Sequence, residues 1–121
     1  MPLNYPGVIT RPDITGLPTE TDSGIYHSLK VVTNFENTKI AVSDDYNGKV
    51  TIYNYTSNNN TWNFEHELYS GSTESSNGFG VSLTMDWDAE RIAVGANVLS
   101  KVYTFDYENG AWSSTPRVIN G

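Results

Sequence analysis

The feature that most constrains the fold of this chain is an internal repeat with an offset of 52 residues. Ile40-Ala41-Val42 recurs as Ile92-Ala93-Val94, and 92 − 40 = 52. The same offset continues without a gap from residue 34 to residue 55, in these pairs: Asn34-Phe35-Glu36 with Asp86-Trp87-Asp88, Lys39 with Arg91, Lys49-Val50 with Lys101-Val102, Tyr53 with Phe105, and Tyr55 with Tyr107. Self-similarity at a fixed period of this order indicates repeated structural units, each of which must bury an apolar face against a neighbour.

The repeat continues beyond residue 55 with a slightly smaller offset. Trp62 pairs with Trp112 and Gly71 with Gly121, which is an offset of 50, because the turn between them is two residues shorter in the second copy. The chain therefore divides into a segment 1–23 outside the repeat, a first unit at 24–71 and a second unit at 72–121.

Each unit is predicted to contain four short antiparallel strands. Runs rich in Val, Ile, Thr and aromatic residues alternate with Asn, Asp and Gly turn signals, and no segment has helical periodicity. The predicted strands are His27–Thr33, Lys39–Ser43, Lys49–Tyr55 and Trp62–Tyr69 in the first unit, and Val81–Met85, Arg91–Gly95, Lys101–Tyr107 and Trp112–Ile119 in the second. The fold class is therefore all-β.

The second unit resembles an FG-GAP repeat. Gly78-Phe79-Gly80 precedes a strand, and after an Asp-rich turn come Ile92-Ala93-Val94-Gly95-Ala96 and then Val102-Tyr103-Thr104-Phe105. FG-GAP repeats form the blades of integrin α-type β-propellers. The first unit departs from the pattern, with His27-Ser28 for Phe-Gly and Ser43-Asp44 for Gly-Ala, and no proline follows Ala96. The resemblance covers residues 24–121.

This resemblance implies two four-stranded antiparallel propeller-type blades with an extended N-terminal arm. Two blades do not close a propeller, which typically needs about four to eight. Three arrangements remain open: several copies complete one ring, the chain is a piece of a longer protein, or the two sheets pack together as a small sandwich. Because Gly121 falls at a unit junction, we expect part of a larger assembly, either oligomeric or covalent.

Segment 1–23 is predicted to be an extended arm. Four prolines recur in it at positions 2, 6, 12 and 18, and proline lacks a ladder donor and restrains its predecessor to extended conformations. The arm also carries more apolar residues than a disordered tail needs. We expect it to contact a partner subunit through Leu3, Tyr5, Val8 and Ile9.

Charge and composition argue against several classes of partner. The formal charge is −7 and the few basic residues are scattered, which disfavours nucleic acid and an anionic membrane surface. No signal peptide or apolar run of transmembrane length is visible, and there is no cysteine. A virion or an extracellular or cell-surface location fits the arm, the absent cysteine and the Asn- and Thr-rich surface.

The FG-GAP resemblance implies one candidate cofactor, a calcium ion in the loop after the second strand. In this chain Asp44, Asp45 and Asn47 are the oxygen donors at that position, and Gly48 makes the turn. The alternating Asp spacing of such loops is absent, and the counterpart Asn97-Val98-Leu99-Ser100 has no carboxylate. A polar hairpin turn without metal is therefore the favoured interpretation.

The sequence contains no combination of residues that indicates an enzyme. Asp86 and Asp88 form a carboxylate pair, but the equivalent residues are Asn34 and Glu36, which favours a turn role. No nucleophile stands in a glycine elbow, and no glycine loop suits phosphate. The aromatic residues could stack on a glycan, and Trp87, which lies in a turn, is the candidate for partner contact.

Two functional hypotheses follow. The first is a non-enzymatic structural, assembly or adhesion protein, such as a virion or appendage component, whose partners are protein subunits. The second is a fragment of a larger cell-surface or secreted β-propeller that binds a protein or a glycan.

Overall fold

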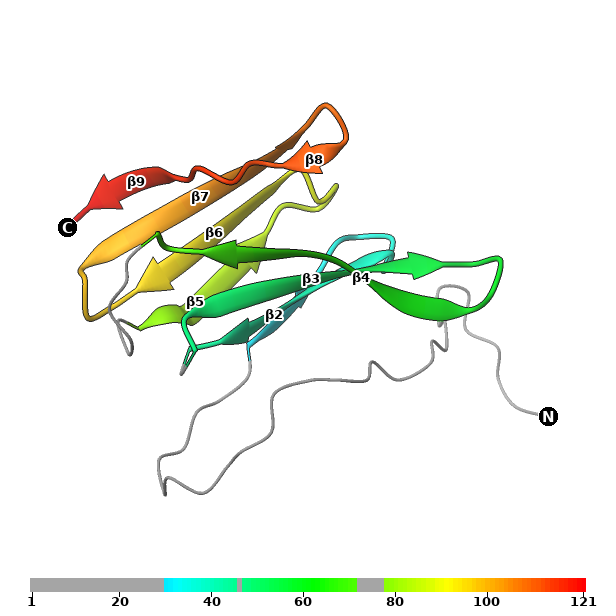
Figure 1. Cartoon of the computed structure of the whole chain (residues 1–121), viewed down its shortest axis with the longest axis horizontal. Helices are drawn as coiled ribbons and strands as arrows, with labels where there is room; N and C mark the ends of the chain where they lie inside the picture. The colour runs from blue at the N-terminus through cyan, green and yellow to red at the C-terminus, as the bar shows by residue number, and fades with distance from the viewer. Residues whose placement is uncertain (1–29, 46, 72–77) are drawn as a thin grey trace, which may run out of the picture.

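The computed structural model describes residues 30–45, 47–71 and 78–121, and every regular element in this part of the chain is a β-strand. The strands form two antiparallel sheets, of four and five strands, which do not close into a barrel (Figure 1). Their bounds are β1 Val31–Thr33, β2 Lys39–Asp44, β3 Lys49–Thr56, β4 Thr61–Tyr69, β5 Phe79–Met85, β6 Arg91–Ala96, β7 Lys101–Glu108, β8 Ala111–Trp112 and β9 Arg117–Asn120.

Both sheets are meanders in which each strand except β9 pairs with its neighbour in sequence. The first sheet has the order β1-β2-β3-β4, and the second has the order β5-β6-β7, with β8 and β9 both pairing with β7. The hairpins between β1 and β2 and between β5 and β6 have similar turn conformations. Asn37 and Ala89, at equivalent positions of the repeat, both adopt the left-handed backbone conformation (φ 56° and 60°). The all-β prediction is confirmed for the described residues, and the expected strand positions agree with the structure there except for the last strand.

One predicted strand is wrong. The sequence predicts a continuous fourth strand over Trp112–Ile119, whereas the structure divides it into β8 and β9 and so gives the second sheet five strands. Pro116 supplies no backbone donor to the ladder. Ser113 instead forms a local turn, in which its hydroxyl donates to the Thr115 carbonyl (2.8 Å) and accepts from the Thr115 amide (3.2 Å).

The interruption also changes the alignment of the two units. Lys49 pairs with Tyr69, and its equivalent Lys101 pairs with Asn120, so the offset after the interruption is 120 − 69 = 51. Gly121 therefore corresponds to Ser70 and not to Gly71, which corrects the offset of 50 expected from the sequence. The gap between β8 and β9 contains one residue more than the matching part of β4.

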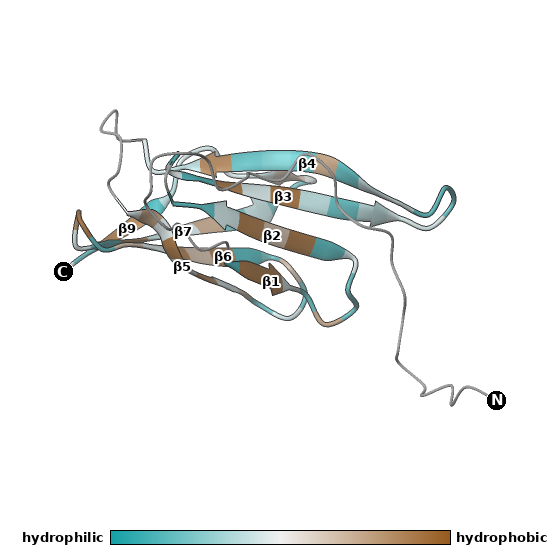
Figure 2. Cartoon of the chain, turned by 90° about the horizontal axis from the view of Figure 1, so that it is seen from below, coloured by the Kyte–Doolittle hydropathy of each residue, from teal (hydrophilic) through white to brown (hydrophobic). Residues whose placement is uncertain are grey.

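The sheets pack on each other through a shared apolar core. The first sheet contributes residues of β2, β3 and β4, and the second contributes residues of β5 to β8. The buried cluster consists of Ala41, Val50, Ile52, Leu68, Phe79, Ile92, Val94, Ala96, Tyr103, Phe105 and Trp112. Figure 2 shows the apolar positions in brown, among them the middle of β2 and part of β5. This core satisfies the need of each sheet to bury one face.

The two sheets use different faces in this contact. We call "front" the face that carries Ile40 and its cross-strand partner Tyr53 in the first sheet, and the equivalent pair Ile92 and Phe105 in the second. Cross-strand partners project from the same face of a sheet. The opposite face, the "back", carries Ala41, Val50, Ile52 and Leu68 in the first sheet. The core therefore joins the back of the first sheet to the front of the second.

The sheets come close together along β5, which lies against β1, β2 and β3. Gly80 sits at the closest point with φ +101°, and a Cβ built on it would lie 3.1 Å from Ser43 Cβ. A side chain at residue 80 would meet both the strained backbone conformation and the neighbouring sheet. Phe79, beside it, is completely buried and packs edge-on against Tyr103 and Phe105.

Replacing Phe79 by alanine is expected to lower the free energy of unfolding by about 3–5 kcal/mol, because it leaves a cavity in the core between the sheets. Val98→Ala is the control, since Val98 is exposed in a turn and its loss should cost less than about 0.5 kcal/mol. Urea titration followed by tryptophan fluorescence measures both. Equal midpoints for the two variants would contradict the assignment of Phe79 to the core.

Candidate functional site

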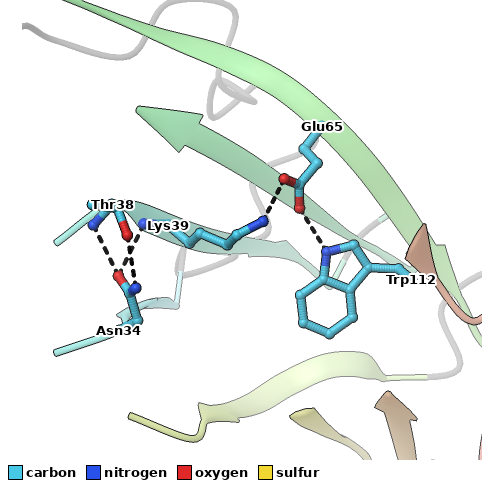
Figure 3. A network of polar contacts seen from close by, with 5 residues as sticks. All are labelled: Asn34, Thr38, Lys39, Glu65 and Trp112. Carbon is cyan, nitrogen blue, oxygen red and sulfur yellow. Dashed lines mark hydrogen bonds and ion pairs between the residues drawn. The ribbon is translucent and has the colours of Figure 1, made fainter. Parts of the chain in front are cut away.

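A polar network crosses from the first sheet to the second and is centred on Glu65 (Figure 3). One carboxylate oxygen accepts from Lys39 Nζ at 2.5 Å, and the other accepts from the Trp112 indole nitrogen at 2.6 Å. Lys39 lies in β2, Glu65 in β4 and Trp112 in β8. The network therefore joins two strands of one sheet to the last hairpin of the other.

A β-bulge places Glu65 in this position. In the ladder between β3 and β4, Tyr53 faces Phe64 and Ile52 faces His66, so Glu65 has no partner of its own. An extra residue of this kind bends the strand and redirects its side chain. Lys39 Nζ also lies 4.6 Å from the centre of the Tyr107 ring, which adds a cation–π contact between the sheets.

A small cavity of about 170 Å³ borders the network and brings His66 near Glu65. A histidine beside a carboxylate is a familiar acid–base arrangement. Here both oxygens of Glu65 already accept hydrogen bonds, from Lys39 and from Trp112. These two bonds tie Glu65 to strands of both sheets.

The hairpin turns at residues 34–38 and 86–90 are stabilised by equivalent side chains. The Asn34 side-chain oxygen accepts from the amides of Thr38 and Lys39, both at 2.9 Å. Asp86 Oδ1 accepts from the amides of Glu90 and Arg91 at 2.7 and 2.8 Å. Asp86 thus holds its own turn, which is the role that the repeat predicts for it.

These two turns place Phe35 and Trp87 side by side on the surface. Their rings lie 5.4 Å apart, and the Phe35 amide donates to the Trp87 carbonyl at 2.8 Å. Both side chains remain mostly exposed, at 74% and 69%. We call this pair the aromatic turn patch. Exposed aromatic residues on a fixed backbone are typical of partner contacts, and sequence reasoning identified Trp87 but not its neighbour.

The candidate calcium loop is arranged as a turn in the described residues. The Asp44 carboxylate accepts from the Asn47 amide at 3.1 Å and from the Asn47 side-chain nitrogen at 2.6 Å. These bonds bring Asp44 and Asn47 together, while Asp45 approaches Gly80 of the second sheet. Within the part of the chain that the structure describes, no three His, Asp or Glu side chains are grouped as a metal site.

A second surface feature is a groove of about 350 Å³ on the back of the second sheet. Gly95, Val102, Ile119 and Gly121 are among the residues that line it. Sequence reasoning missed the groove, because only the register of β9 on β7 places Ile119 beside Val102.

Charged residues at the edge of the same face form an ion-pair cluster. Asp106 accepts from Arg91 Nε at 2.6 Å and lies 3.1 Å from Arg117 Nη2. The hydrogen bond from Arg91, aided by the positive charge of Arg91 and Arg117, holds the pKa of Asp106 below its ordinary value. On the front of the first sheet, a hydrogen bond from Tyr69 lowers the pKa of Glu67.

The predicted partner-binding residues of the arm, Leu3, Tyr5, Val8 and Ile9, lie outside the described residues. So does His27, the first-unit counterpart of Phe79. Their roles stay predictions.

Comparison with known proteins identifies a similar fold but no family. No family model matches the chain, and no curated protein matches it. Among solved structures, the crystal structure of a protein from Lactobacillus plantarum is similar, with a TM-score of 0.53 and 18% sequence identity. The match covers 75% of this chain and 25% of that chain, so this chain spans about a quarter of the solved protein's length. At this identity the likeness concerns the fold alone.

Replacing Glu65 by alanine is expected to destabilise the chain by about 1–3 kcal/mol, because the Trp112 indole and the Lys39 ammonium lose a shared acceptor at a partly buried site. Glu67→Ala, in the same strand, is the matched control. Glu67 lies 3.5 Å from Lys49 in a more exposed ion pair, and its loss should cost under about 1 kcal/mol. Chemical denaturation compares the two, and a Glu65 variant no weaker than the Glu67 variant would contradict the bridging role.

Proposed function

We propose that this chain is a non-enzymatic structural module, in which propeller-like blades stack face to back as part of a larger protein assembly. The FG-GAP resemblance of the second unit supports the comparison with blades. A virion or appendage component, or an adhesion protein, is the setting that fits the composition of the chain.

One observation carries the proposal: the back of the first sheet packs on the front of the second. The contact covers the back of the first sheet, whereas the equivalent back of the second sheet, with Val102 and Ile119 exposed, is left to be covered by something else. Contacts of this kind between repeats extend into rings or linear arrays. A two-sheet sandwich that paired equivalent faces would have no such tendency.

The shape of the contact supports the comparison with a propeller. In each unit the strands form a meander, and the two sheets approach each other closely along one strand, β5 (Figure 1). Propeller blades have this organisation, with four-stranded meanders arranged around an axis. The departure is β8 and β9, which share the place of one strand.

The polar network supports a structural role rather than a catalytic one. Glu65 accepts hydrogen bonds from Lys39 and Trp112, and Asp86 accepts from two amides of its own turn. These groups fix the geometry of the sheets. No helix in the described residues is long and apolar enough to cross a membrane.

The mass of the full chain in solution tests the assembly role. We expect sedimentation velocity over a range of concentrations to show discrete multimers whose population rises with concentration, because the exposed apolar residues on the back of the second sheet favour association. A species that stays monomeric at every accessible concentration, yet unfolds cooperatively, would contradict the proposal. Amide exchange on the same samples reports whether the strands are protected.

A second candidate function is a ligand-binding part of a larger surface β-propeller. One observation favours it: the aromatic turn patch is exposed. In this alternative, Trp87 and Phe35 would contact a glycan or a protein.

Binding to an immobilised glycan array tests this alternative. We expect Trp87→Ala to reduce binding of the full chain at least about 10-fold, since aromatic hot spots commonly contribute more than about 1–2 kcal/mol. Val98→Ala, at another exposed turn residue, is the control. No binding by the unaltered chain, or equal binding by both variants, would eliminate the glycan-binding alternative.

A further inference from the structure

We propose that the aromatic turn patch binds a basic segment of a partner protein, with an arginine side chain stacked on Trp87 and paired with the carboxylates beside it. This inference rests on the second candidate function, the ligand-binding role, and names the class of ligand. Neither ring of the patch belongs to the core between the sheets or lines the groove on the back of the second sheet, so the surface is a separate one.

The backbone holds the two rings of the patch in place. The Phe35 amide donates to the Trp87 carbonyl, which joins the two turns, and the side chains of Asn34 and Asp86 each close their own turn. The rings touch each other and remain mostly exposed. An aromatic surface that is ordered before its partner arrives loses little conformational freedom on binding.

Carboxylates flank the rings in both turns. Glu36 follows Phe35, Asp88 follows Trp87, and Glu90 ends the second turn. All three carboxylate residues are exposed, and neither turn contains a lysine, an arginine or a histidine. Between described residues, no ion pair involves any of these three carboxylates.

The cations that follow these turns in the chain are engaged elsewhere. Lys39, directly after the first turn, pairs with Glu65 at 2.5 Å. Arg91, directly after the second turn, pairs with Asp106 at 2.6 Å. The negative charge beside the aromatic rings is therefore left for a partner to balance, and charge complementarity across an interface favours a basic partner.

Arginine is the side chain that matches both features of the patch. Its planar guanidinium stacks on an aromatic face and keeps donors at its edge for a carboxylate. Trp87 supplies the aromatic face, and Asp88, the next residue in the chain, supplies an acceptor. A glycan hydroxyl also donates to a carboxylate, but it carries no charge to balance, so a basic protein segment fits the patch better.

A second copy of this chain is a poor source of that basic segment. Only 7 of the 121 residues are lysine or arginine, against 14 aspartate and glutamate residues. Four of these cations are each paired with a carboxylate of their own chain, namely Lys39, Lys49, Arg91 and Arg117. The occupant that the charges favour is therefore a different protein, whose surface carries exposed arginine.

Fluorescence anisotropy with labelled peptides tests the inference in the full chain. The probe is a peptide of arginine residues spaced by glycine and serine, and two matched peptides carry glutamine or glutamate in place of each arginine. We expect the arginine peptide to bind, the glutamine peptide to bind at least about 10-fold more weakly, and the glutamate peptide not to bind. Added salt should weaken the arginine contact, because the carboxylates are exposed.

Two pairs of variants locate the contact. Trp87→Ala should weaken binding of the arginine peptide about 10-fold, whereas Val98→Ala, in the turn at the other end of β6, should leave it unchanged. Asp88→Asn should weaken binding about threefold, whereas Glu67→Gln, which removes the same charge from β4, should change it less than about 1.5-fold. The Glu67 control separates contact at the patch from general attraction to an acidic chain. Circular dichroism establishes that each variant folds.

The outcomes separate this inference from the ligand-binding role. Equal binding of the arginine peptide by each variant and its control would overturn the patch as the site of a basic segment. No binding of the arginine peptide, together with glycan binding that depends on Trp87, would overturn the basic partner and leave the ligand-binding role in place. No binding of either the peptide or a glycan would overturn the ligand-binding role itself.

Discussion

The apolar contact between the two sheets is the interaction on which the rest of the structure depends. Each sheet alone would expose a face of aromatic and branched residues, and neither has a helix to cover it in the described residues. Burying Phe79, Phe105 and Ile52 between the sheets removes that surface from water. The contact pairs the back of the first sheet with the front of the second, so equivalent faces of the two units have different surroundings.

The polar network fixes the position of the sheets within that contact. Apolar packing tolerates small displacements, whereas a carboxylate that accepts from both Lys39 and Trp112 restricts them. The bulge at Glu65 makes this possible, since a regular β4 would direct the side chain differently. The second unit replaces this segment with the Ser113–Pro116 interruption, so the two units are related in fold but not in this detail.

The choice of faces covers the back of the first sheet but not the equivalent back of the second. Val102 and Ile119 consequently remain exposed on that back face. The aromatic turn patch lies elsewhere, at turns between strands, and is a second exposed surface of the chain.

The sequence by itself determined the all-β class, the two units and nearly all the strands, because residue alternation, turn residues and an offset of 52 are local properties of the chain. It also placed Trp87 in an exposed turn. Only the tertiary structure decided that Phe35 joins Trp87, that Glu65 meets Trp112, and that Ile119 lies beside Val102. These pairs depend on a bulge, an interruption and the relative position of two sheets. Such features arise from packing between distant segments, and no local pattern specifies them.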